Sequence, residues 1–203
     1  MLFRSLAYDD CEMPPGPLYL AGTGYGWRYA GWDQQGRVTQ GFVMTALTPL
    51  AYSNLQLSAT RASGGYIYQS SGRALDVLTA LRDYHTEGDI NHIGRSNDEL
   101  WVSFLARREQ NQSWTLALCR SGVTWVDQGR VVTVLQSGGN WALQLMGDPS
   151  NQFVSSIPAT VGQTFLMVLR MKWAGDSPSN IVEWYVNPSE LGGAPSVTPT
   201  ATL

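Results

Sequence analysis

Acidic and imidazole side chains gather in one short stretch of the chain. His85 comes first, and two residues later begins the run Glu87-Gly88-Asp89-Ile90-Asn91-His92. On a strand, Glu87 and Asp89 would point to the same side, because alternate residues share a face. Two carboxyls held about 5–5.5 Å apart can act as acid and nucleophile in a retaining glycosidase. The run is therefore a candidate for glycoside hydrolysis.

The same side chains are also of the types that bind zinc. Their spacing, His-x-Glu-x-Asp-x-x-His, supplies imidazole and carboxylate ligands. The chain has no further histidine, and nothing elsewhere in the sequence converges on this stretch. Gly88 and its polar neighbours favour a solvated loop. We therefore expect a loop with two exposed imidazoles, no metal and no catalysis.

We expect no cofactor, and calcium is the one ion that the sequence leaves open as an alternative. A calcium site needs several oxygen ligands from loops. Asp148 and Asp176 both lie in turn-like segments. Aspartates in turns usually bind their own backbone instead. The expectation is thus no cofactor, with calcium as the alternative.

Composition excludes several classes of function. The 203 residues are 43% hydrophobic and 14% charged, with a net charge of -3, whereas a nucleic-acid binder needs a basic surface. No apolar run reaches the length of about 18 residues that a transmembrane helix requires. Cys11 and Cys119 are the only cysteines, too few for a disulfide scaffold. They either pair in an oxidising compartment or remain free.

The first residues do not resemble a signal peptide, because 1–8 hold an arginine and no apolar core. Leu2–Ser5 can be back-translated to CTCTTCCGATCT, the end of a widely used sequencing adapter. We expect 1–7 to be a non-native extension that replaced the true start, and with it a signal peptide. A natural start is the alternative. The polar, nearly uncharged stretch 46–72 favours an extracellular or cell-surface location.

The elements that position these side chains are strands. Alternating apolar and polar residues, with β-branched and aromatic enrichment, mark about ten segments. They are 40–45, 52–58, 73–78, 99–107, 113–119, 123–126, 130–135, 141–146, 164–173 and 181–186. Turn residues separate them, so the sequence predicts an all-β sandwich or barrel.

Two hairpins and one helix are more specific expectations. A short polar turn predicts that 99–107 pairs with 113–119. The segments 164–173 and 181–186 form a second hairpin, in which Phe165 and its alternates oppose Ile181 and its alternates. A helical turn is expected over 187–191, because Asn187 can cap it and Pro188 suits its first position. The stretch 78–93 is either a helical turn or a loop.

Three groups of residues, in this order, resemble a known family. They are Gly22-Thr23-Gly24-Tyr25-Gly26-Trp27 with Gly31-Trp32; Gly72-Arg73-Ala74-Leu75-Asp76; and Leu100–Leu105 with Trp184–Pro188. The pattern resembles the concanavalin A-like, laminin-G-like jelly-roll modules of secreted proteins from environmental bacteria. Cys11 departs from it, because an aromatic residue follows Tyr-Asp-Asp in those modules. The resemblance implies an antiparallel two-sheet jelly-roll sandwich, with one domain over 8–193 and a linker or terminal edge strand over 194–203.

The resemblance also bears on the acidic stretch. The β-glucanases of this superfamily carry a strand that reads Glu-x-Asp-x-(x)-Glu. Glu87 and Asp89 match it, but His92 stands in place of the second glutamate, so we expect no hydrolase.

Tryptophans beside turns are the candidate ligand-binding residues, because an aromatic ring can stack on a sugar. They are Trp27, Trp32, Trp125 and Trp141. The alternative for each is that it closes the core.

The expected function is a non-catalytic extracellular module within a larger multidomain chain. Its partner would be a glycan or another cell-surface ligand. A purely structural or adhesive spacer is the first alternative, and a degenerate β-glucanase-like hydrolase is the second.

Overall fold

The computed structural model describes part of the chain. The described residues are 16–17, 33–35, 43–46, 50–53, 55–56, 60–63, 70–72, 85–86, 89–93, 97–110, 115–119, 130–145, 148–174, 180–190 and 198–203. The chain divides into two compact units, Met1–Ile93 and Gly94–Leu203. Each unit is described by itself. The expected single domain over 8–193 stays a prediction.

The first unit holds short strands. They are β1 (Gly16–Pro17), β2 (Asp33–Gln35), β3 (Val43–Ala46), β4 (Ala51–Tyr52), β5 (Leu55–Gln56), β6 (Thr60–Ser63), β7 (Ser70–Gly72), β8 (His85–Thr86) and β9 (Asp89–Ile93). They form one three-stranded sheet, β1-β3-β6, and the pairs β2-β7, β4-β5 and β8-β9. The described residues of the segment expected as one strand over 52–58 belong instead to the β4–β5 hairpin, in which Ser53 has a φ of 53°. The strand expected over 73–78 lies outside the described residues.

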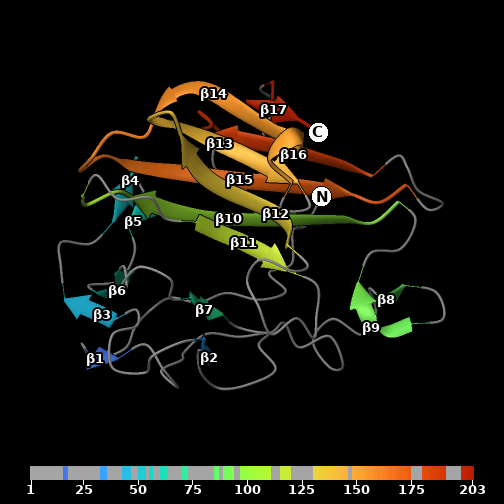
Figure 1. Cartoon of the computed structure of the whole chain (residues 1–203), viewed down its shortest axis with the longest axis horizontal. Helices are drawn as coiled ribbons and strands as arrows, with labels where there is room; N and C mark the ends of the chain where they lie inside the picture. The colour runs from blue at the N-terminus through green and yellow to red at the C-terminus, as the bar shows by residue number, and fades with distance from the viewer. Residues whose placement is uncertain are drawn as a thin grey trace. The chain divides into compact units, whose positions relative to one another are not determined.

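The second unit is built from two antiparallel four-stranded sheets (Figure 1). The first has the order β10-β15-β16-β17 and the second β11-β12-β13-β14. Their bounds are β10 (Glu99–Arg107), β11 (Thr115–Cys119), β12 (Arg130–Ser137), β13 (Asn140–Leu145), β14 (Gln152–Pro158), β15 (Thr164–Lys172), β16 (Ile181–Val186) and β17 (Ala201–Thr202). The described part of the chain contains one helical turn, the 3₁₀ turn Pro149–Asn151, and no α-helix. The all-β, two-sheet prediction is confirmed at this level.

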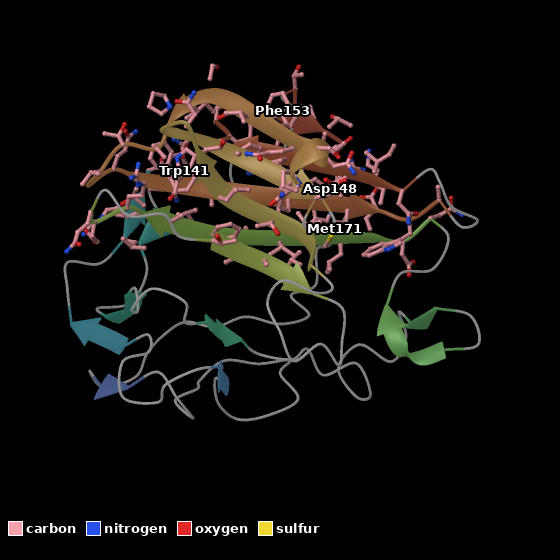
Figure 2. All side chains as sticks on the ribbon, in the orientation of Figure 1. Trp141, Asp148, Phe153 and Met171 are labelled. Atoms are coloured by element: carbon pink, nitrogen blue, oxygen red, sulfur yellow. The ribbon has the colours of Figure 1, made fainter. Side chains whose placement is uncertain are left out.

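The core of the second unit lies between these sheets. Trp141 and Leu143 from β13 share one buried cluster with Phe165 and Met167 from β15. The rings of Trp141 and Phe165 meet edge to face, 5.3 Å apart at an interplanar angle of 70°. Figure 2 labels Trp141 beside the ribbons of both sheets. Alternate residues of each strand therefore face a common apolar interior, as a sandwich requires.

The predicted pairing of 99–107 with 113–119 is wrong. β10 pairs with β15 over nine residues, from Glu99 opposite Lys172 to Arg107 opposite Thr164. β11 pairs instead with β12 in the other sheet. The long ladder places the apolar face of β10 beside that of β15, and a five-residue β11 could not offer so many apolar partners. The alternation along 99–107 predicts that Leu100 and its alternates share one face of the strand, and this is confirmed because these residues pack against the core.

The β15–β16 hairpin is confirmed, but its expected register is wrong by one residue. Met171 lies opposite Val182 and Leu169 opposite Trp184, while Ile181 lies opposite Lys172. A shift of one residue exchanges the two faces of a strand. The observed register buries Trp184 completely and leaves Ile181 37% exposed. Burying the larger ring removes more apolar area from water, which favours this register.

The helical turn expected at 187–191 is not formed over 187–190. Asn187 adopts a left-handed φ of 52°, which a helix cannot include. Its backbone N–H donates to the carbonyl of Leu166 at 2.8 Å, and its Oδ1 accepts from the Leu166 N–H at 2.8 Å. Asn187 therefore ends β16 by binding back to β15.

The sequence pattern missed β14 in the second unit, as it missed β1, β2 and β6–β9 in the first. The bulge of β14 lies opposite Trp141, where the pairing register with β13 shifts. The buried Ser155 hydroxyl fills the gap, donating to the Trp141 carbonyl at 2.8 Å and accepting from the Ile157 N–H at 3.1 Å. Because of the bulge, apolar and polar residues do not alternate cleanly along β14. The strand expected over 123–126 lies outside the described residues.

Candidate functional site

Of the four tryptophans expected to bind ligand, the described residues include only Trp141. Its side chain is fully buried in the core. A ring with no exposed surface cannot stack on a sugar, so Trp141 corresponds to the core-closing alternative. Trp27, Trp32 and Trp125 lie outside the described residues.

The acidic and imidazole stretch is described in part. β8 and β9 pair antiparallel, with His85 opposite Ile93 and Thr86 opposite Asp89. Part of the expected loop, including His92, is therefore a strand, which suits the β-branched Ile90 and Ile93. Glu87 and Gly88 lie outside the described residues. Across the described positions, no group of three or more His, Cys, Asp or Glu side chains could hold a metal ion.

Asp148, which is labelled in Figure 2, binds its own turn, as aspartates in such turns commonly do. One carboxylate oxygen accepts from the Ser150 N–H at 2.9 Å, and the other accepts from the Ser150 hydroxyl at 2.7 Å. The Asn151 amide donates a further bond at 3.2 Å. The hydrogen bonds from Ser150 lower the pKa of Asp148. Asp176 and Cys11 lie outside the described residues, and Cys119 is the last residue of β11.

The residues that the structure does bring together lie on the first sheet, on the face turned away from the core. They belong to three neighbouring strands and occupy the positions that alternate with core residues. We call this group the Arg170 cluster, and it consists of Glu99, Trp101, Arg170, Lys172, Glu183 and Tyr185.

Arg170 is the centre of the cluster because β15 lies between β10 and β16. Its Nε donates to Glu99 Oε2 at 3.1 Å, and its Nη2 donates to Glu99 Oε1. Its Nη1 donates to Glu183 Oε2 at 3.1 Å. One guanidinium therefore joins carboxylates from both neighbouring strands, the bidentate geometry that arginine favours.

Glu183 is the most heavily bonded carboxylate of the group. Besides Arg170, it accepts from Lys172 Nζ at 2.8 Å and from the Tyr185 hydroxyl at 3.1 Å. Its side chain is only 14% exposed. A carboxylate so far removed from water needs these partners to remain ionised.

Two aromatic rings complete the cluster. The Trp101 and Tyr185 rings are stacked, with centroids 6.4 Å apart and an interplanar angle of 22°. The guanidinium carbon of Arg170 lies 5.0 Å from the Trp101 ring centroid, within cation–π range. Trp101 is half-buried and Tyr185 is buried. Part of the indole is thus open beside charged hydrogen-bonding groups.

The electrostatics of the cluster keep both glutamates ionised. The hydrogen bond from Arg170 lowers the pKa of Glu99, against the opposing effect of partial burial. Burial alone would raise the pKa of Glu183, but hydrogen bonds from Lys172, Tyr185 and Arg170 outweigh it and lower the pKa. A general acid needs a carboxyl that stays protonated near neutral pH. The lowered pKa values of Glu99 and Glu183 favour the ionised form of both carboxylates instead.

Sequence reasoning singled out neither Trp101 nor the four charged members as ligand-binding residues. A signal was present, since Arg170 and Lys172 interrupt an otherwise apolar segment at alternate positions, and Glu183 does the same in its strand. Only the register reveals that these interruptions line up across three strands.

The described residues include no helix that is long and apolar enough to cross a membrane. Comparisons of the chain with protein-family models, with curated proteins and with solved structures found no match.

Proposed function

We propose that this chain is a non-catalytic binding module for a glycan or another cell-surface ligand, carried within a larger secreted protein. The observation that carries the proposal is the half-buried Trp101, stacked with Tyr185 and bordered by Arg170 and Glu99. A pyranose ring has apolar C–H faces and a rim of hydroxyls. It needs an aromatic surface and nearby hydrogen-bonding groups together, and the Arg170 cluster offers both.

The two-sheet sandwich supports the same proposal. The interior between the sheets is filled by apolar side chains, which leaves the outward sheet faces and the loops for recognition. We assign the sandwich to the jelly-roll, concanavalin A-like kind on the strength of the sequence motifs. The extracellular location rests on composition.

A glycan array with the purified full chain tests this function. We expect binding to at least one polysaccharide, and at least about a tenfold loss of affinity in Trp101→Ala, because the variant removes the aromatic surface. Phe153→Ala is the matched control, since Phe153 is a 36% exposed aromatic residue on β14 of the other sheet. Its binding should equal that of the wild type.

Trp32→Ala belongs on the same array, because the sequence pattern singles out Trp32. Loss of binding in Trp32→Ala with full binding in Trp101→Ala would move the site away from the Arg170 cluster. Absence of binding to every glycan would favour the purely structural module. Release of reducing sugar from a bound glycan would favour the hydrolase.

A further inference from the structure

We infer that the Arg170 cluster selects an uncharged saccharide and rejects acidic ones. This inference rests on the proposed function and names the ligand class of that same site. It starts from the charges on the outward face of β10, β15 and β16. In the described residues of these strands, the charged side chains of that face are Glu99, Arg107, Arg170, Lys172 and Glu183.

Each of these charges already has an opposite partner. Arg170 binds Glu99 and Glu183, Lys172 binds Glu183, and Arg107 binds Glu109 at 2.7 Å. With Glu109 included, three cations face three carboxylates, so the net charge of the surface is zero. These six charges therefore cancel and add no local attraction for an anionic or a cationic polymer.

An acidic sugar that approached the remaining N–H groups of Arg170 would also meet the negative charges of Glu99 and Glu183, and it could pair fully with the guanidinium only by displacing one of them. Displacing Glu183 would remove the guanidinium from a carboxylate that is only 14% exposed and leave it with Lys172 and Tyr185 as partners. Removing a charged partner from a carboxylate so far out of water is unfavourable. Displacing Glu99 would break two hydrogen bonds at once. The existing pairs therefore oppose entry of an anion.

A hydroxyl group meets no such opposition, because it can both donate and accept. A guanidinium has five N–H donors and each carboxylate oxygen has two lone pairs. Three N–H groups of Arg170 are engaged by Glu99 and Glu183, and Arg170 also hydrogen-bonds with Tyr185. Glu99 accepts from Trp101 as well as from Arg170. Neighbouring hydroxyls of a sugar can bind the donors and lone pairs that remain without breaking an ion pair.

The test compares neutral and acidic polysaccharides as ligands of the purified full chain. Neutral β-glucan, mannan and xylan are set against alginate, polygalacturonate and heparin, at 50 and 500 mM NaCl. We expect retention by at least one neutral polymer, with less than a twofold change between the two salt concentrations, because no net charge is neutralised on binding. Acidic polymers should not be retained.

A variant that changes the charge of the cluster should reverse its preference for neutral polysaccharides. Glu99→Gln removes one carboxylate, leaves part of the Arg170 guanidinium open, and gives the surface a net charge of +1. We expect it to acquire binding to alginate or polygalacturonate at 50 mM NaCl that weakens at least fivefold at 500 mM. Glu109→Gln is the matched control: it also adds one positive charge but leaves Arg170 paired, and should acquire at least fivefold less. Thermal unfolding by circular dichroism verifies that both variants fold.

The outcomes separate the two proposals. Retention of acidic polymers by the wild type would overturn the charge selection and leave the binding function standing. Equal gains in Glu99→Gln and Glu109→Gln would also overturn it, because general surface charge would then explain the binding. Retention of no polymer would overturn the binding function itself, and the selection with it.

Discussion

The two faces of the sheet β10-β15-β16-β17 are built from the same strands, but different interactions stabilise them. The inner face buries Met167, Leu169 and Trp184 completely. The outward face carries Arg170 and Glu183 at positions that alternate with these residues. Inner residues stabilise the fold through the apolar area that they remove from water. Outward residues matter when a change leaves a partly buried charge without its partner. The comparison predicts effects that differ in size and in their dependence on pH.

The largest effect should follow from Trp184→Ala on the inner face. A large cavity in a close-packed core lowers the free energy of unfolding by about 3–5 kcal/mol. Ile181→Ala, at a 37% exposed position of the outward face of the same strand, should lower it by less than about 1 kcal/mol. Urea unfolding followed by tryptophan fluorescence measures both variants. Equal losses would break the distinction between the two faces.

An intermediate effect is expected for Glu183→Gln on the outward face. The amide keeps the shape of the side chain but leaves Arg170 and Lys172 without one negative charge. We expect a loss of about 1–2 kcal/mol, reduced from that of a deeply buried pair because water still reaches Arg170. The exposed Arg107–Glu109 pair is the comparison, and Glu109→Gln should change stability by less than about 0.5 kcal/mol. Urea midpoints at constant slope measure the difference.

A smaller effect, of opposite sign, is expected on the other sheet. Thr133 is fully buried on the face of β12 that does not line the core. Within the described residues its hydroxyl has no hydrogen-bond partner. Thr133→Val preserves the shape and removes the unpaired group, so we expect a gain of about 1 kcal/mol in the free energy of unfolding. A loss of stability would indicate that the hydroxyl has a partner, such as an ordered water.

The smallest effect is the pH dependence that comes from Glu99 and Glu183. Their pKa values are lower in the folded chain than in the unfolded chain. The stability that they contribute is therefore fully present above the ordinary carboxyl pKa and is lost as the pH falls through that range to the lowered values. The effect is modest because the Glu99 side chain is still 33% exposed. Urea unfolding at pH 7 and at pH 3.5 measures it, and the decrease should be smaller in Glu183→Gln.

Much of the second unit could be predicted from local pattern. The alternation of Leu100, Val102 and Phe104 with polar or aromatic neighbours determined both the strand and its inward face. Gly138 and Gly139, with φ values of 57° and 86°, mark the turn that joins β12 to β13, because such angles favour glycine. β14 escaped prediction because a bulge held by Ser155 breaks its period.

The Arg170 cluster could not be predicted from the local sequence pattern for a different reason. Glu99 and Arg170 are 71 residues apart in the chain, and the sequence of one strand does not specify which distant strand will pair with it. The short polar turn after β10 even favoured the wrong neighbour. The position of Trp141 had the same limit, because a tryptophan beside a turn can face solvent or close a core.

The sequence by itself determined that the chain forms strands, which side chains share a face of each strand, and where several tight turns fall, because these depend on residues within a few positions of one another. Only the tertiary structure decided that β10 lies beside β15, that Trp184 rather than Ile181 faces inward, and that Glu99, Arg170 and Glu183 meet. Those outcomes depend on the apolar area and the ion pairs gained when distant segments come together, and these arise from the pairing of whole strands.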